Sequence, residues 1–186
     1  MRLFVALETP AALRAALGTV CEQGRRGGIL WVPADNVHLT LKFLGEVEDG
    51  LAVDVGGALV PVAAAAASFD LAFGGAGCFP SDRAPKVIWI GLATGATETS
   101  RLAAAVEDAL APLGFAREER PFRAHVTIGR VKDAAAGYIA ARDKSKILNS
   151  FRTEEARVTA LVLYNSVLTP QGSVYRAVGS FPFGSR

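Results

Sequence analysis

The 186-residue chain contains little cysteine. Cys21 and Cys78 lie far apart, and neither belongs to a short Cys-Cys or Cys-His spacing. The sequence therefore indicates neither a zinc site of the usual ligand spacing nor a disulfide framework. We expect two reduced thiols, packed as small hydrophobic side chains. We expect no metal ion and no other cofactor.

The chain also has little net charge and no long apolar run. Its 20 basic and 18 acidic side chains leave a net charge of +2. This balance does not provide the broad basic surface of a protein that wraps duplex nucleic acid, but it is compatible with a small anion or one nucleic-acid end. No apolar run is long enough to span a membrane, and no signal peptide follows Met1. We expect a cytoplasmic protein with no membrane contact.

A hydrophobic content of 51% in a chain of this length is sufficient to form a core without cross-links. Apolar periodicity and turn residues predict strands and helices in alternation. We expect strands at residues 2–8, 37–44, 68–73, 86–92, 122–131, 157–168 and 174–181. Helical patterns cover residues 10–21, 51–62, 102–113 and 133–142. Residues 169–172 should join the last two strands as a hairpin.

Glycine-rich phosphate loops after a strand are absent, so a doubly wound nucleotide fold is poorly supported. Interspersed strands and helices favour an α+β architecture. The order strand, helix, strand recurs in both halves, which suggests a duplication with two lobes related by a pseudo-twofold axis. We therefore expect one domain over residues 1–186, built from two intertwined lobes. Mostly antiparallel sheets flanked by helices would enclose a central cleft.

Histidine occurs only twice, and both histidines stand in the same tetrad pattern. The tetrads are His38-Leu39-Thr40-Leu41 and His125-Val126-Thr127-Ile128. In a strand, residues i and i+2 project to one face, so each tetrad presents an imidazole and a hydroxyl on one side and two apolar residues on the other. A single such match occurs often by chance. Two matches that use every histidine in the chain indicate function.

Two imidazoles that face each other can take one proton and give another near neutral pH. Attack of water on a phosphodiester needs both steps, because the nucleophile loses a proton and the departing alkoxide gains one. The hydroxyls of Thr40 and Thr127 can hold a non-bridging phosphate oxygen. The pattern predicts phosphoryl chemistry at His38 and His125 without a metal ion.

Three cations near the tetrads are candidate phosphate ligands. Arg130 would lie opposite His125 in ideal alternation, but a bulge at Gly129 would turn it back. Lys42 shares the His38 face by alternation, and Arg123 shares the His125 face. A solvated surface position is the alternative for each of the three.

Four aromatic residues near the tetrads are candidates for stacking on a base. Phe43 and Phe122 alternate onto the faces opposite the histidines, so we expect them in the core. Trp31 and Trp89 are also assigned a packing role, with stacking on a base as the alternative.

Two segments resemble the two-histidine phosphoesterase superfamily: WVPADNVHLTLKFLGE at residues 31–46 and RPFRAHVTIGR at residues 120–130. Within that superfamily the chain is most similar to the bacterial and archaeal RNA 2',3'-cyclic phosphodiesterases, also called the 2'-5' RNA ligase family. The similarity extends to RLFVALETP, FPSDRAPKVIWIGL and LVLYNSVLTPQGSVY, and so covers nearly the whole chain.

The resemblance implies a bilobal fold and metal-independent hydrolysis of an RNA 2',3'-cyclic phosphate end to a 2'-phosphate. It implies that His38 donates a proton to the leaving 3' oxygen and that His125 accepts a proton from water. It also matches Arg130 to the arginine that follows the second tetrad of the family. Ala124 departs from the pattern, because the family usually has proline there.

Several alternatives stay open. The same site could join a cyclic-phosphate end to a 5'-hydroxyl, giving ATP-independent 2'-5' ligation. It could also act on a small cyclic nucleotide rather than on RNA. From a different class, the chain could be a non-catalytic module that binds RNA ends. We expect a monomer whose partner is RNA with a 2',3'-cyclic phosphate terminus.

Overall fold

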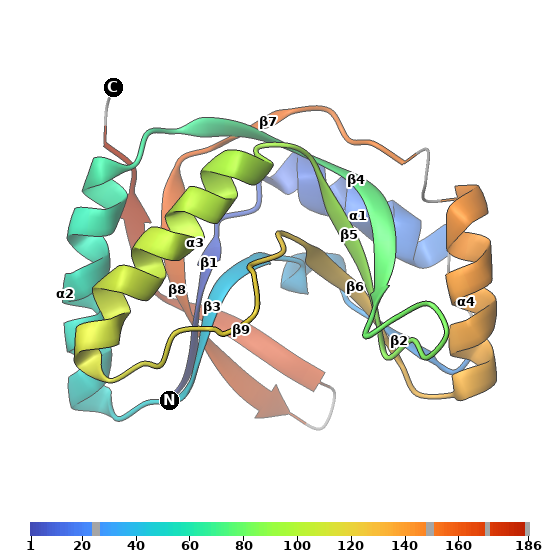
Figure 1. Cartoon of the computed structure of the whole chain (residues 1–186), viewed down its shortest axis with the longest axis horizontal. Coiled ribbons are helices and arrows are strands. Elements are labelled where there is room, and N and C mark those ends of the chain that lie inside the picture. The colour runs from blue at the N-terminus through green and yellow to red at the C-terminus, as the bar shows by residue number, and fades with distance from the viewer. Residues whose placement is uncertain (24–26, 148–150, 170–171, 185–186) are drawn as a thin grey trace.

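The computed structural model describes residues 1–23, 27–147, 151–169 and 172–184 (Figure 1). One sheet contains β1 (Arg2–Leu7), β3 (Leu39–Glu46), β8 (Ala160–Thr169) and β9 (Gly172–Pro182). A second contains β2 (Ile29–Trp31), β4 (Phe69–Phe79), β5 (Val87–Thr94), β6 (Val126–Val131) and β7 (Ala156–Val158). The strand orders are β3-β1-β8-β9 and β2-β6-β5-β4-β7, and every neighbouring pair is antiparallel.

Helices cover one face of each sheet and leave the other face to the space between the sheets. The first sheet packs against α2 (Asp49–Ala65) and α3 (Ala96–Leu110), and the second against α1 (Ala11–Gln23) and α4 (Ala134–Ile147) (Figure 1). Short 3-10 turns lie at Ala34–Asn36 and Ala111–Leu113. Within the described ranges, no helix combines the length and apolar content that crossing a membrane requires.

The two halves of the chain repeat one order of elements and exchange their last strands. The first half runs β1-α1-β3-α2-β4 and the second runs β5-α3-β6-α4-β8. Strand β1 pairs with β3 on one side and with β8 from the second half on the other, and β5 pairs with β6 on one side and with β4 from the first half on the other. The predicted bilobal, pseudo-twofold α+β fold is therefore confirmed, with two lobes intertwined by exchange.

All residues from Leu3 to Leu7 of β1 are buried, and alternate ones face the helices. In β1, Leu3, Val5 and Leu7 belong to the main core cluster, and each is at most 1% exposed. Burying a side chain of this size contributes about 1.5–3 kcal/mol. Cys21 and Cys78 are buried as small hydrophobic residues, as the sequence predicts.

Both tetrad strands begin later than predicted. The strands start at Leu39 and Val126, so His38 and His125 each stand one residue before the ladder. Each imidazole bonds a backbone carbonyl two residues earlier in the chain. That local bond turns the backbone where apolar alternation predicts a continuous strand.

Strand β4 is longer than predicted. It continues through Gly74, Gly75 and Gly77 to Phe79, where the sequence favours an irregular connection. The pairing with β5 is interrupted near Gly75, whose φ of 68° is a left-handed conformation suited to glycine. Gly77 lies beneath the ring of Trp89, and a Cβ there would come within 2.0 Å of the indole. The glycines therefore make room inside a strand rather than end it.

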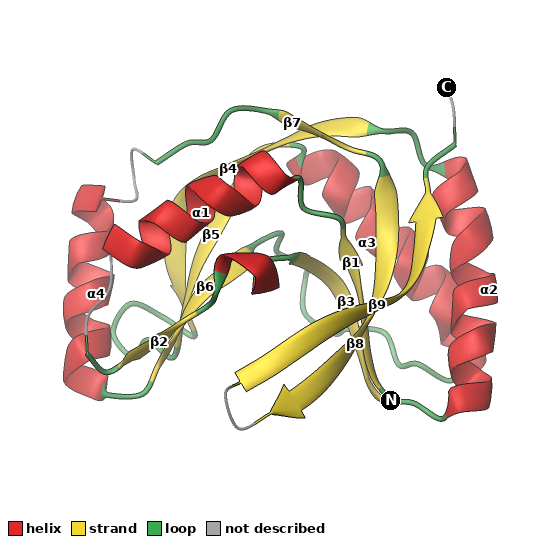
Figure 2. Cartoon of the chain, turned by 180° about the vertical axis from the view of Figure 1, so that it is seen from behind, coloured by secondary structure: helices red, strands yellow, loops and turns green. Residues whose placement is uncertain are grey.

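The final predicted strands are partly confirmed. The hairpin of β8 and β9 is present, and its turn residues 170–171 lie outside the described residues (Figure 2). The strand predicted at residues 157–168 is divided, because β7 pairs with β4 while β8 pairs with β1. The predicted helix end at Gly114 is confirmed by its left-handed φ of 89°.

Candidate active site

A cleft of about 910 Å³ collects both tetrads on its walls. His38 and Thr40 line it from the first sheet, and His125 and Thr127 line it from the second. Arg130 lines the same cleft. Two histidines that are 87 residues apart in the sequence are thus brought to one site, as the duplicated pattern predicts.

The two imidazoles are held by the same bond. Nδ1 of His38 lies 2.7 Å from the carbonyl oxygen of Asn36, and Nδ1 of His125 lies 2.7 Å from that of Arg123. A carbonyl oxygen only accepts, so Nδ1 donates its proton in each ring. This fixes the tautomer and leaves Nε2 of each histidine as the nitrogen that can exchange a proton with a ligand.

Aromatic rings surround His38. Its ring centroid lies 4.6 Å from that of Phe4, and the ring of Tyr175 meets it edge-on at 4.7 Å. Phe4 also stacks on Tyr164 at 5.3 Å. These contacts orient the imidazole and exclude water from it. The sequence pattern does not assign Phe4 or Tyr175 to the site, although alternation in β1 and β9 is a signal that could have placed them there.

A second aromatic group surrounds His125. Phe79 meets its ring edge-on at 5.0 Å, and Trp89 lies at 6.1 Å and stacks on Phe79. The guanidinium of Arg123 lies 5.3 Å from the centre of the Trp89 ring, in a cation-π arrangement. Arg123 precedes β6, so strand alternation does not place it, yet it lines the cleft beside His125. The packing role predicted for Trp89 therefore includes contacts within the site.

Both histidines are less basic than usual. Burial lowers the pKa of His38 from 6.5 to about 4, the carbonyl of Asn36 opposes that shift, and the Arg130 guanidinium adds to it. Burial also lowers the pKa of His125, with the carbonyl of Arg123 opposing and its guanidinium adding. Both imidazoles are therefore neutral at pH 7.

A bulge in β6 returns Arg130 to the face of the second tetrad. Thr127 pairs with Trp89 and Gly129 pairs with Ile88, which leaves Ile128 as the extra residue. Arg130 then pairs with Val87, which shares a strand face with Trp89. The bulge expected at Gly129 is thus present one residue earlier, and it turns the guanidinium toward the cleft.

The same bulge in β3 has the opposite consequence for Lys42. Ala6 pairs with Thr40 and Val5 pairs with Lys42, so Leu41 is the extra residue. Lys42 therefore shares the core-facing side with Val5 and is only 4% exposed. The strand face predicted for Lys42 is wrong, because strict alternation does not allow for the bulge, although Lys42 still contributes to the cleft lining.

Phe43 and Phe122 are not core residues, and that prediction is wrong as well. Phe43 is 68% exposed and Phe122 is 36% exposed, and both line the cleft. The bulge at Leu41 turns Phe43 to the face of Phe4, its pairing partner. Phe122 lies in the connection before β6, outside any strand.

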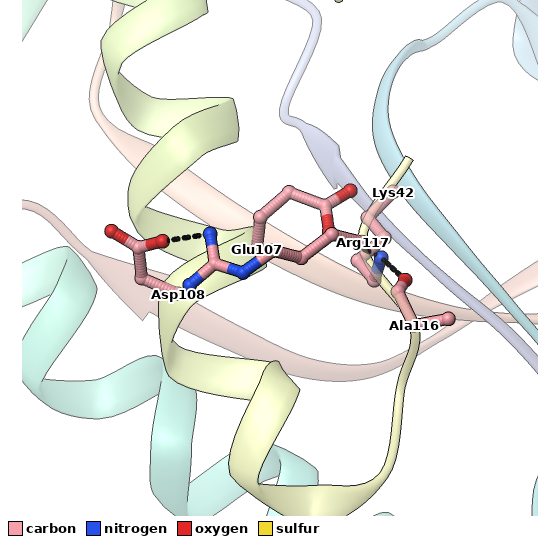
Figure 3. Close-up of polar contacts among 5 residues, drawn as sticks. All are labelled: Lys42, Glu107, Asp108, Ala116 and Arg117. Atoms are coloured by element: carbon pink, nitrogen blue, oxygen red, sulfur yellow. Dashed lines mark hydrogen bonds and ion pairs between the residues drawn. The ribbon is translucent and has the colours of Figure 1, made fainter. Parts of the chain in front are cut away.

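The Lys42 ammonium connects β3 to the segment between α3 and β6. Its Nζ donates to a carboxylate oxygen of Glu107 at 2.6 Å and to the carbonyl oxygen of Ala116 at 2.7 Å (Figure 3). Arg117, the next residue, pairs with Asp108 on the exposed side of α3. Residues 114–124, which lead directly to His125, are therefore tied to the strand of the first tetrad.

A resident metal ion has no evident ligand set in the described ranges, where no group of three His, Cys, Asp or Glu side chains lies close enough to hold one. The polar groups of the two tetrads and of Arg123 and Arg130 are imidazoles, hydroxyls and guanidinium groups, and the carboxylates of Glu107, Glu118 and Glu119 also line the cleft. Such a set suits the binding of a phosphate anion together with proton transfer to and from its oxygens.

Known proteins resemble this chain over almost its whole length. Residues 8–168 match the sequence model of the 2'-5' RNA ligase superfamily. An RNA 2',3'-cyclic phosphodiesterase of Archaeoglobus fulgidus is 33% identical over 185 residues, which cover 97% of this chain and 99% of that protein. One from Thermotoga maritima is 32% identical over 184 residues, which cover 96% of this chain and 93% of that protein.

Solved structures share the fold. A crystal structure of a Thermus thermophilus protein has a TM-score of 0.82 and 28% identity, and the alignment covers 100% of both chains. Escherichia coli LigT in complex with 3'-AMP has a TM-score of 0.78 and 23% identity, over 99% of this chain and 98% of that one. The intertwined arrangement of the two lobes is therefore the arrangement found in these crystal structures.

Proposed function

Because the chain belongs to the 2'-5' RNA ligase superfamily, we propose that it hydrolyses the 2',3'-cyclic phosphate at an RNA end to a 2'-phosphate. The observation that carries this proposal is the pair of imidazoles in one cleft, each with Nδ1 committed to a carbonyl and each accompanied by a threonine. An acid and a base with a site for an anion between them are what the reaction requires. The name given to several relatives supports RNA as the substrate.

In the proposed reaction, Nε2 of His125 accepts a proton from water as the water oxygen bonds to phosphorus. The bond from phosphorus to the 3' oxygen breaks, and Nε2 of His38 donates a proton to that oxygen. The products are a 2'-phosphate and a 3'-hydroxyl, and the two histidines end with exchanged protonation states. A 5'-hydroxyl in place of water would form a 2'-5' linkage, which we propose as an accompanying activity.

The threonines and Arg130 stabilise the phosphate in this proposal. Thr40 and Thr127 lie on opposite walls of the cleft, and their hydroxyls donate to non-bridging oxygens as negative charge develops. The planar guanidinium of Arg130 can donate two parallel bonds to the same group. We propose that Arg123 contacts the anion from the second lobe. Lys42 acts as a positioning residue, because its ammonium is engaged by Glu107 and Ala116.

The low histidine pKa values give substrate binding a role in protonation. His38 must carry a proton to act as the acid, yet its pKa of about 4 leaves it neutral at pH 7. A bound phosphodiester anion near the ring favours the imidazolium and raises that pKa. The negative charge of the bound substrate therefore favours protonation of His38, so that the acid is formed when the substrate binds.

Phosphorus NMR tests the proposal directly. An oligoribonucleotide with a 2',3'-cyclic phosphate is incubated with the purified protein in the presence of a chelator. We expect conversion of the cyclic-phosphate resonance to that of a 2'-phosphate monoester. A 3'-phosphate product would reverse the assignment of the leaving oxygen, and an unchanged cyclic phosphate would overturn the proposed activity. Exposed Arg101 on α3 lies outside the cleft, so Arg101→Lys serves as the matched control for variants in the cleft.

A further inference from the structure

Phe43 is an aromatic side chain that the fold does not bury. It is 68% exposed, whereas its neighbour in pairing, Phe4, is 2% exposed. Leaving a phenylalanine ring in water forfeits most of the free energy that its burial would provide. Packing therefore does not explain an aromatic residue at this position, and its exposed ring is available to a ligand.

The bulge at Leu41 aims this ring at the cleft. After the bulge, Phe43 follows Thr40 on the face that carries the first tetrad. Arg130 holds the corresponding position after Thr127 and the bulge at Ile128 in the second half. One wall of the cleft thus continues from its tetrad to a cation, and the other continues from its tetrad to an exposed aromatic ring.

Phe43 lies close to the reacting groups. Its ring centroid is 5.8 Å from that of Phe4, which is in turn 4.6 Å from the imidazole of His38. One same-face step along a strand is about 7 Å, which sets the scale of the separation between Thr40 and Phe43. A ribose spans a comparable separation between its 2',3' oxygens and its base. A phosphate held at Thr40 therefore leaves the attached base within reach of the Phe43 ring.

The space beside Phe43 is open. Strand β3 is the outer strand of its sheet, whereas β6 has β2 as a further neighbour. Residues 114–124 lie opposite the β3 edge and contribute Arg120 and Phe122 to the cleft lining. Glu118 and Glu119 of the same segment also line the cleft. Because these carboxylates offset the arginine charge, the segment does not form a continuous basic surface for RNA phosphates. An aromatic ring near cations suits a base, because every base presents a face for stacking.

We propose that Phe43 forms a stacking subsite for the base of the nucleotide that carries the cyclic phosphate. This inference rests on the proposed function, because it places the phosphate between the tetrads. Phe43 then determines the preference for the terminal base and takes no part in proton transfer. A purine, with its larger face, gains more from the subsite than a pyrimidine does.

The test compares substrates with and without a base. The first is an oligoribonucleotide that ends in adenosine 2',3'-cyclic phosphate, and the second is glycerol 1,2-cyclic phosphate, which has the same five-membered ring and no base. Phe43→Ala should lower kcat/KM for the oligonucleotide on the order of 10- to 100-fold, mainly through KM. It should leave kcat/KM for the base-free substrate within about twofold. Phe43→Trp should restore the oligonucleotide rate.

A matched control guards against a general effect of losing an exposed aromatic residue. Tyr138 on α4 is 60% exposed and lies outside the cleft lining. Tyr138→Ala should therefore leave kcat/KM unchanged for both substrates. If Phe43→Ala lowers kcat/KM equally for both substrates, or for neither, the proposed stacking subsite is wrong. If the wild-type protein hydrolyses neither substrate, the proposed function itself fails. The outcomes for the two proposals are therefore distinguishable.

Discussion

The two tetrad walls of the cleft share their local structure and differ in the residues beyond it. In each, the histidine precedes a strand, bonds the carbonyl two residues back, and is followed by a bulge at the fourth residue of the tetrad. Beyond the bulge, one wall continues to Lys42 and Phe43 and the other to Gly129 and Arg130. The two walls thus repeat the same local structure around the histidine and the threonine, and they differ in the residues after each bulge.

The difference also concerns how each tetrad strand is supported. Strand β6 is flanked by β2 on its outer side, and the carbonyl of Ile128 at the bulge accepts from the amide of Val32 at 2.9 Å. Strand β3 has no such neighbour in the described residues, and Lys42 instead ties it to Glu107 and Ala116. One wall is fixed by backbone pairing and the other by a buried side chain.

Removing either histidine should have the largest effect. His38→Ala and His125→Ala should each lower kcat/KM for the cyclic-phosphate oligonucleotide by roughly 10²–10⁴. A substrate with sulfur in place of the 3' oxygen separates their roles, because a thiolate leaves without needing a proton. We expect this substrate to rescue His38→Ala and not His125→Ala. Rescue of His125→Ala alone would exchange the assigned roles, and full activity in either variant on the natural substrate would remove that histidine from the mechanism.

Breaking the side-chain tie on the β3 wall should reduce stability. Lys42→Met leaves the half-buried Glu107 without its cation, which costs about 3 kcal/mol in the free energy of unfolding. The double variant Lys42→Met/Glu107→Met should recover part of that loss. Arg117→Ala is the control, because its exposed pair with Asp108 contributes less than about 1 kcal/mol. Urea unfolding measures all three, and a Lys42→Met loss no larger than that of Arg117→Ala would contradict the role of this tie.

Changing the cation on the opposite wall should have a smaller effect. Arg130→Lys keeps the charge but loses the planar pair of donors, so kcat/KM should fall roughly tenfold. Arg130→Gln should also raise the pKa of His38, because the guanidinium lowers it across the cleft. An NMR titration of the imidazole protons reports that shift. An unchanged His38 pKa in Arg130→Gln would show that the two walls are not electrostatically coupled.

The pH dependence of stability should show the smallest effect. The folded pKa of His38, about 4, is below its usual 6.5, so the unfolded chain takes up a proton first as the pH falls. His38 therefore contributes stability above pH 6.5, and this contribution is lost as the pH decreases toward 4. From pH 7 to pH 5 we expect a loss on the order of 1 kcal/mol. His38→Asn should show a flatter profile of urea midpoint against pH. Parallel profiles would contradict the lowered pKa.

The sequence predicts the parts of the site that depend on local pattern. The repeated pattern of the two tetrads predicts that His38, Thr40, His125 and Thr127 belong to the site. Gly129, which follows the second tetrad, indicates the bulge that turns Arg130 toward the cleft. The bulge at Leu41 has no such marker, because no glycine accompanies it. The predictions for Lys42 and Phe43 are wrong for that single reason, since one extra residue reverses every later side chain on a strand.

Long-range features lie beyond local pattern. The segment before β6 is held by a contact that no local pattern predicts, because Ala116 accepts a bond from Lys42 across 74 residues. The exchange of β4 and β8 is also invisible in apolar periodicity, because each strand has the same alternation in either sheet. The sequence pattern therefore predicts where the strands lie but not which strands pair with each other.

The exchange of β4 and β8 has a mechanical consequence. Each lobe contains a central strand encoded by the other half of the sequence, so widening the cleft would strain two separate crossings of the chain at once. Hinge closure depends on a few residues that absorb a rotation between independent bodies, and this topology does not provide such bodies. We therefore expect the spacing of the two imidazoles to be set by the strand exchange and to change little when a ligand binds.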